Sequence, residues 1–159
     1  MVTEQQMNSI DFLDEPVKSK NYYKVNPSDM SRFDDNRKKL AFKINSIVLS
    51  YELENDLSRN KTGEIICEKT QQSWDSYKKV IYGKTSASRT LLYKFCIGMN
   101  LSLAESAELF DLSEEGPLNE KVRGDYIFLN ALGKDSIQSF IKEYEEYTQK
   151  KISLRDSSR

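Results

Sequence analysis

The stretch that decides the fold is SWDSYKKVIYGKTSASRTLLYKF, residues 73–95. Ser73 stands where a helix cap is expected, and apolar residues recur behind it at helical spacing, so the first half predicts a helix that ends at Tyr82. Gly83 follows in the position at which helices commonly end. Ser88 then caps a second helix, whose apolar face is formed by Leu91, Leu92, Phe95, Cys96 and Met99. Two short helices joined by a glycine and a polar tract indicate a helical chain.

The same helical spacing continues on both sides of this stretch. Further helices are predicted where apolar residues recur at helical intervals: residues 34–54, 62–69, 102–112, 119–132 and 134–149. Residues 1–33 show no sustained period and are interpreted as a partly disordered arm, and residues 150–159 as a polar tail. Only 6 glycines and 3 prolines interrupt the 159 residues. We therefore predict an all-α chain.

The composition argues against an enzyme. The chain has no histidine, which removes the commonest general base and a common metal ligand, and it has no glycine-rich loop that would hold a phosphate. We therefore expect no catalytic residue, no metal site and no cofactor. Cys67 and Cys96 lie within apolar stretches, so they are expected to be buried free thiols, which suits the reducing cytoplasm.

The chain also lacks the sequence features of a membrane or secreted protein. No apolar run approaches the roughly 18 residues that a membrane span needs. The N-terminus MVTEQQMNSIDFLDEP has neither a basic nor an apolar signal region. We therefore expect a cytoplasmic protein that does not bind membranes.

The charge is unevenly distributed along the chain. Residues 36–102 carry 12 basic and 6 acidic side chains, whereas residues 1–35 are net −3 and residues 103–159 net −4. Residues 70–94 hold a single acid, Asp75, and five bases: Lys78, Lys79, Lys84, Arg89 and Lys94. Such a cluster favours an anionic partner, although a charged surface that only keeps the chain in solution has the same composition.

The sequence GKTSASRTLLYKFCIGMNLSLAESAELFDL, residues 83–112, resembles the Cro/cI-like (XRE) helix-turn-helix family. In that family a glycine and a few polar residues precede a capped helix with paired leucines, and a Gly-apolar-Gly/Asn-Leu-Ser/Thr-Leu-Glu segment leads into a fifth helix. The matching residues are Gly83, Ser88, Leu91, Leu92, Gly98, Leu101, Ser102, Leu103, Glu105 and Leu109. The chain departs from the pattern at Gln72, where the turn residue is normally apolar, and at Ala87, where proline is usual.

The continuation GPLNEKVRGDYIFLNAL, residues 116–132, is similar to a small bacterial subgroup of the same family. The matching residues are Pro117, Leu118, Arg123, Asp125, Ile127, Phe128 and Leu132. The resemblance covers residues 36–147 and implies a five-helix helix-turn-helix domain, residues 34–112, with a two-helix extension, residues 113–149. Its members are known as regulators, so the implied function is a sequence-specific DNA-binding transcriptional regulator of bacterial or phage origin.

In helix-turn-helix proteins the second helix of the motif enters the major groove with its N-terminal residues against the bases. The base contacts are therefore expected at the start of that helix: Ser73, Trp74, Asp75, Ser76 and Lys79. Cations, hydroxyl groups and a helix N-terminus favour phosphate, so the expected phosphate contacts are Lys78, Lys84, Thr85, Ser86, Ser88 and Arg89. The alternative is a solvated helix face with Trp74 packed on a neighbouring helix.

A homodimer on double-stranded DNA is expected, because one helix in one groove discriminates poorly and operators mirror the two-fold symmetry of the protein. We predict the dimer surface in residues 119–149. The N-terminal arm is a candidate ligand for a protein partner, since it places apolar residues among acids: Phe12, Leu13, Tyr22 and Tyr23. The alternative function is a non-enzymatic protein-interaction or inhibitor module on the same scaffold, which the acidic ends, Gln72 and Asp75 favour.

Overall fold

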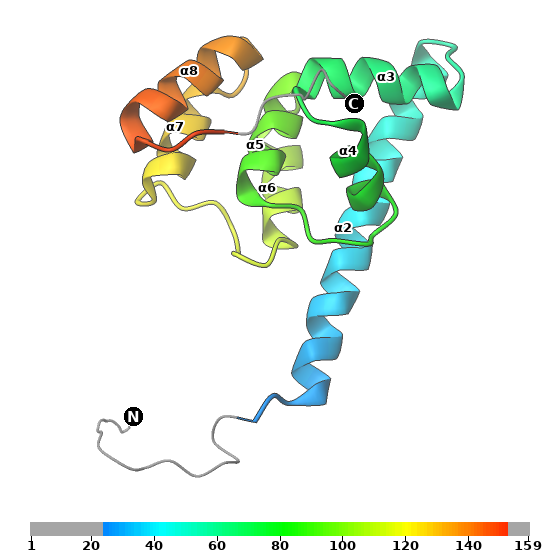
Figure 1. Cartoon of the computed structure of the whole chain (residues 1–159), viewed down its shortest axis with the longest axis vertical. Helices are drawn as coiled ribbons and strands as arrows, with labels where there is room; N and C mark the ends of the chain where they lie inside the picture. The colour runs from blue at the N-terminus through cyan, green and yellow to red at the C-terminus, as the bar shows by residue number, and fades with distance from the viewer. Residues whose placement is uncertain (1–23, 153–159) are drawn as a thin grey trace. The chain divides into compact units, whose positions relative to one another are not determined.

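The computed structural model describes residues 24–152, which form seven α-helices and no strand (Figure 1). The all-α prediction is confirmed for this part of the chain. The compact unit discussed below begins at Asp34. The helices are α2 (Pro27–Glu54), α3 (Arg59–Thr70), α4 (Trp74–Ile81), α5 (Arg89–Gly98), α6 (Leu103–Asp111), α7 (Arg123–Ala131) and α8 (Ile137–Thr148). None of these helices is long and apolar enough to cross a membrane.

Serine caps fix where several of these helices begin. As predicted, Ser73, Ser88 and Ser102 each accept a hydrogen bond from the backbone N–H three residues on, at 3.1, 3.2 and 3.1 Å. The Glu105 side chain accepts in return from the N–H of Ser102 (2.9 Å), which completes a capping box. Each cap satisfies an otherwise unpaired donor and stabilises its helix by about 1 kcal/mol.

The start of α2 differs most from the prediction. The helix begins at Pro27 and not at residue 34, so the predicted start of this helix was wrong. The residues Asn26 and Pro27 signal this start in the sequence. In the structure Asn26 Oδ1 accepts from the N–H of Ser28 (2.9 Å), and proline suits the first position of a helix. The rest of the predicted arm that could contact a protein partner, residues 1–23, lies outside the described residues.

Three other helix starts also shift. Ser58 caps α3, so this helix begins at Arg59 rather than at residue 62. Ser136 caps α8 in the same way, and α8 begins at Ile137 rather than at residue 134. Helix α7 begins at Arg123, after a turn in which the N–H of Val122 donates to the carbonyl of Asn119 (2.9 Å). Each shift follows a local hydrogen bond that apolar spacing does not reveal.

Helix α5 is the central element of the core. It packs against α3, α6 and α8, and Figure 1 shows it between the earlier and the later helices. Its Tyr93 is 2% exposed. The Tyr93 ring centroid lies between 5.1 and 5.9 Å from those of four other aromatic rings: Phe110, Phe128, Phe140 and Tyr144. These rings come from α6, α7 and α8, so one side chain of α5 joins three later helices.

Glycine sets the distance between the ends of α3 and α5. A Cβ atom at Gly98 would lie 2.3 Å from the carbonyl oxygen of Lys69 and 2.9 Å from the Cα of Thr70. These are backbone atoms, which cannot rotate away. Only glycine therefore allows the two helices to pass this closely.

Both cysteines are buried and neither forms a disulfide, as predicted. Cys67 lies in α3 and Cys96 in α5. Burial raises the pKa of the Cys96 thiol to about 12, so this thiol stays protonated near neutral pH. The two residues therefore serve as small apolar side chains of the core.

We expect Gly98→Ala to lower the free energy of unfolding by about 1–3 kcal/mol, the usual cost of forcing extra atoms into a packed interior. The new methyl group meets the Lys69 carbonyl, so α3 and α5 must separate. Urea unfolding measures the change. Lys142→Ala, on the exposed face of α8, is the control and should change stability by less than about 0.5 kcal/mol. Equal stability of Gly98→Ala and the wild type would contradict this close approach.

Candidate nucleic-acid interface

The candidate interface begins with the pair α3 and α4, which residues 71–73 connect. Gln71 adopts a left-handed conformation (φ 52°), and the N–H of Gln72 donates to the carbonyl of Cys67 (3.1 Å). The chain therefore turns sharply after α3. Gln72 is 4% exposed, and its Nε2 donates to Thr70 Oγ1 at 2.7 Å. The polar residue at this turn is thus buried, with its amide nitrogen bonded inside the fold.

Trp74, at the start of α4, packs against α3. A Cβ atom at Gly63 of α3 would lie 2.5 Å from the Trp74 ring, so glycine leaves the space that the indole fills. The ring also lies beside Tyr77, with 5.7 Å between centroids. Trp74 was predicted to contact a base, and the structure shows it partly buried between two helices. Its packing fixes how α4 lies on α3.

The other predicted base contacts follow on the same helix. Ser73 Oγ accepts from the N–H of Ser76 and also donates to Ser76 Oγ (3.0 Å), so Ser73 is occupied as a cap. Asp75 and Lys79 are both exposed and form an ion pair of 3.0 Å across one helical turn. Lys78 is exposed beside them. Ser73, Asp75, Ser76 and Lys79 thus lie together around the start of α4, and their contacts with one another are hydrogen bonds and an ion pair.

The tract between α4 and α5 carries most of the predicted phosphate contacts. The N–H of Gly83 donates to Val80 at 3.0 Å and its φ is +69°, a conformation that glycine adopts without strain. Lys84 and Thr85 are exposed. Ser86 Oγ donates to Glu114 Oε2 (2.5 Å). Lys84 and Thr85 are thus available to a ligand, whereas Ser86 is held by an acid.

Arg89 is drawn into the fold, away from the exposed cations. Its Nε and Nη2 donate to the two carboxylate oxygens of Asp125 at 2.8 and 2.6 Å. Its Nη1 donates to the carbonyl of Gly116 (2.8 Å), and Nη2 also donates to that of Pro117 (2.9 Å). The guanidinium lies 4.9 Å from the centroid of the Phe110 ring. Its side chain is 11% exposed, so its donors are used within the protein.

Asp125 is the fully buried acceptor of this network. Besides Arg89, the hydroxyl of Tyr93 and the N–H of Asn119 (2.9 Å) donate to its carboxylate. Burial alone would raise the pKa of Asp125, but the hydrogen bonds from Arg89, Tyr93 and Asn119 outweigh it and lower the pKa below its ordinary value. The same hydrogen bond from Arg89 to Asp125 raises the pKa of Arg89. The pair is therefore ionised in the folded protein.

Lys94, also counted among the clustered cations in the sequence, lies inside the fold as well. It is 4% exposed, and its Nζ donates to the carbonyl of Gln71 at 2.7 Å. Burial lowers the pKa of Lys94 to about 8. This hydrogen bond connects α5 to the turn between α3 and α4. Two of the five clustered bases are thus structural, and three remain on the surface.

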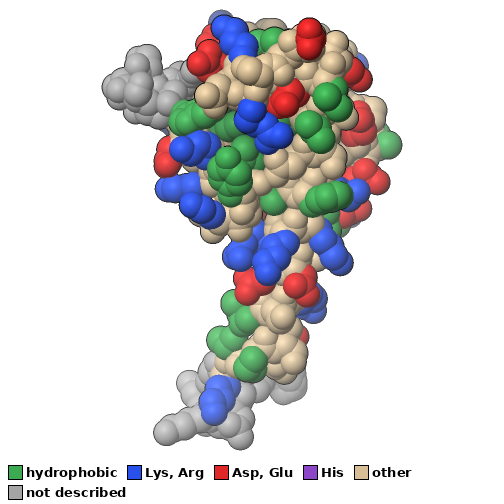
Figure 2. Space-filling model, turned by 90° about the vertical axis from the view of Figure 1, so that its right-hand side faces the viewer, with side chains coloured by type: hydrophobic (Ala, Val, Ile, Leu, Met, Phe, Trp, Pro, Cys, Tyr) green, Lys and Arg blue, Asp and Glu red, His purple; other side chains and the backbone are tan. Residues whose placement is uncertain are grey.

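The surface around α2, α3 and α4 is mixed in charge. Figure 2 shows basic and acidic side chains intermixed on this side of the molecule. The exposed cations of the candidate interface are Lys78, Lys79 and Lys84. Within the described residues no cluster of acids and cysteines is arranged to hold a metal ion.

No protein-family model, curated protein or solved structure matches this chain. The resemblance to the Cro/cI-like family therefore stays a prediction. The function must be inferred from the residues and their geometry.

We expect Arg89→Ala to lower the free energy of unfolding by about 3–5 kcal/mol, because it leaves the Asp125 carboxylate buried without its main partner. Urea unfolding at neutral pH measures the change. Arg59→Ala is the matched control: Arg59 is exposed, and its ion pair with Glu52 (3.1 Å) should contribute about 1 kcal/mol or less. Similar losses in the two variants would show that the Asp125 network does not hold the fold.

The same network predicts how stability depends on pH. Because the pKa of Asp125 is lower in the folded than in the unfolded chain, its contribution is complete above the unfolded pKa of about 4 and is lost as the pH falls through the folded value. Asp125→Asn should therefore flatten the fall in stability below about pH 4. If the stability of Asp125→Asn falls with pH as steeply as that of the wild type, the lowered pKa of Asp125 is contradicted.

Proposed function

We propose that the chain is a cytoplasmic, sequence-specific DNA-binding transcriptional regulator of the Cro/cI-like helix-turn-helix type. The observation that carries the proposal is the arrangement of α3 and α4. A capped helix of 8 residues is held against α3 by Trp74 and turns its polar side chains outward. A single helix with polar side chains fits the major groove of DNA.

The start of α4 divides into residues that position the helix and residues that reach the bases. Ser73 and Trp74 fix α4 on α3, through the cap and the packed indole. Lys79 is exposed, and Ser76 is half-buried with its hydroxyl accepting from Ser73; these two are the proposed base contacts, because a lysine suits guanine and a serine suits any base edge. Asp75 keeps Lys79 in place through their ion pair and offers an acceptor to a cytosine amine.

The proposed phosphate contacts are the exposed residues next to this helix: Lys78, Lys84 and Thr85. Ser86 and Ser88 lie in the same tract and are also proposed phosphate contacts, because their hydroxyl groups can donate to a phosphate oxygen. Ser86 must first break its hydrogen bond to Glu114. Arg89 is left out of the proposed phosphate contacts, because its donors are used by Asp125, Gly116 and Pro117.

We place the dimer contact on α7 and α8, where large apolar side chains remain exposed. Tyr126 is 57% and Tyr147 56% exposed. They line a groove of about 400 Å³ together with Ile127 of α7. A second copy of the chain would cover these rings, since aromatic residues are typical of interface cores.

The proposal is tested by a salt titration of duplex binding, with the DNA that flanks the gene and a random duplex as probes. Lys84→Ala should weaken binding to both duplexes alike and lower the salt slope by about one unit, because phosphate contacts carry no sequence information. Ser76→Ala or Lys79→Ala should cost roughly 1–3 kcal/mol at one base position only. Lys134→Ala, in the turn after α7, is the control and should leave both affinities unchanged.

The dimer is tested by measuring mass in solution. Tyr126→Glu should turn a dimer into a monomer, because it buries a charge in an apolar contact. Leu53→Glu, on the exposed side of α2, is the matched control and should leave the dimer intact. If Leu53→Glu gives a monomer and Tyr126→Glu does not, the dimer contact lies on α2 and not on α7 and α8.

A protein-interaction module remains the second candidate, and one observation favours it. Phe42, Leu49 and Leu53 are 73%, 43% and 71% exposed and fall on one side of α2 at intervals of seven and four residues. Such a stripe suits the apolar face of a helix from a partner protein. If the wild type binds no duplex even at low ionic strength, α4 is a scaffold helix and this second function replaces the first.

A further inference from the structure

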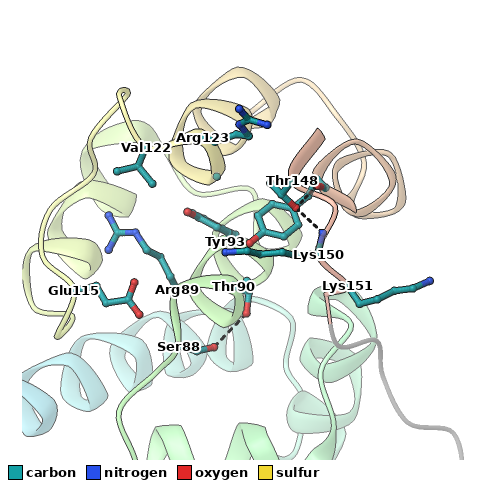
Figure 3. A pocket seen from close by; sticks show the side chains of 12 residues that line it. Ser88, Arg89, Thr90, Tyr93, Glu115, Val122, Arg123, Thr148, Lys150 and Lys151 are labelled. Atoms are coloured by element: carbon teal, nitrogen blue, oxygen red, sulfur yellow. Dashed lines mark hydrogen bonds between the residues drawn. The ribbon is translucent and has the colours of Figure 1, made fainter. Parts of the chain in front are cut away.

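A hollow of about 660 Å³ opens beside the first turns of α5. Its wall is formed by the start of α5, the start of α7 and the segment that follows α8 (Figure 3). The volume lies within the range of about 300–1,000 Å³ that is typical of small-molecule sites. Tyr93 and Tyr144 are among the residues that line it, so the hollow has an aromatic floor.

Three cations approach the hollow from three different elements. Figure 3 shows Arg89 of α5 and Arg123 of α7 on different sides, and Lys150 reaching across the space, whereas Lys151 points outward. Arg89 is neutralised by Asp125 behind it. Within the described residues Arg123 and Lys150 form no ion pair, and Arg123 donates only to the carbonyl of Tyr147 (3.0 Å).

The acids around the hollow leave this positive charge largely in place. Glu115 is the acid that lines it, and Glu115 is exposed at the edge. Asp125 is fully buried and already accepts from Arg89, Tyr93 and Asn119. The charges of Arg123 and Lys150 thus exceed that of Glu115, so the hollow is suited to an anion.

Neutral donors complete the wall. The hydroxyl groups of Ser88 and Thr90 lie 3.3 Å apart at the lower edge. Gly124 lines the hollow in the first turn of α7, where Val122 supplies no side-chain cap. A Cβ atom at Gly124 would lie 2.9 Å from the hydroxyl oxygen of Tyr93, so a glycine lets this turn pack directly against Tyr93. Backbone N–H groups, hydroxyl groups and two nearby cations are the donors that phosphate prefers.

We propose that this hollow binds a small organic phosphate, with the phosphate group held by Arg123 and Lys150 and the organic part against the tyrosines. The space exceeds what a lone phosphate ion fills, which is why a phosphorylated compound of metabolite size is the fitting class. The proposal does not depend on DNA binding. A phosphate of the DNA backbone has the same chemistry, and the test separates the two sources.

The test is isothermal titration of the full chain, without DNA and at low ionic strength, with ribose 5-phosphate and adenosine monophosphate as probes. Ribose and adenosine are the uncharged controls. The affinity of inorganic phosphate shows how much the organic part of each probe contributes to binding. We expect saturable binding of a phosphorylated probe, stronger than that of inorganic phosphate and absent for the uncharged controls. Arg123→Gln and Lys150→Gln should each weaken it at least about tenfold, the effect expected of a lost charge-assisted hydrogen bond.

Lys142→Gln on α8 removes the same charge away from the hollow and should not change the affinity. Circular dichroism shows whether each variant is folded, and Lys150 follows the last helix, so its variant should keep the fold. The proposal is overturned if no phosphorylated probe saturates, or if Lys142→Gln weakens binding as much as Lys150→Gln. It is also overturned if only duplex DNA binds in a Lys150-dependent way, since the hollow would then be part of a DNA surface.

Discussion

The ion pair between Arg89 and Asp125 is the interaction on which the second half of the structure depends. A carboxylate with no exposed surface is tolerated only if donors surround it, and here the donors come from separate places along the chain. Arg89 and Tyr93 belong to α5, and Asn119 to the irregular segment before α7. Because Arg89 also binds the carbonyls of Gly116 and Pro117, it orders a segment that has no helix of its own. The same residues therefore place α7 and the wall of the hollow.

Helix α5 relates the two candidate sites to each other. Arg89 and Tyr93 are four residues apart and share one face, towards α6, α7, α8 and the hollow. Lys94 leaves the helix in another direction and holds the carbonyl of Gln71, in the turn before α4. Gly98 brings the end of the same helix against α3. One buried helix thus supports the proposed DNA-reading helix on one side and the proposed phosphate site on the other.

The sequence predicted local features well, because they depend on residues close together in the chain. Ser73, Ser88 and Ser102 could be predicted as caps because each hydroxyl bonds a backbone N–H only three residues further along the chain. The all-α class could be predicted from the helical spacing of the apolar residues. The roles of Arg89 and Lys94 could not be predicted in this way. Arg89 meets Asp125 across 36 residues, and a basic residue beside a polar tract has the same local pattern whether its partner is a buried acid or a phosphate. The hollow was missed for the same reason, since its wall combines three segments that only the tertiary fold brings together.

The position of Trp74 has a practical consequence. It is the only tryptophan in the chain, whereas the 9 tyrosines are spread along it. Its indole lies in the space that Gly63 leaves on α3 and beside the ring of Tyr77. Fluorescence excited at wavelengths that tryptophan absorbs and tyrosine does not therefore comes from the junction of α3 and α4 alone. The protein carries a built-in optical reporter of that junction, and a ligand that loosens or tightens it can be followed by emission wavelength without attaching a dye.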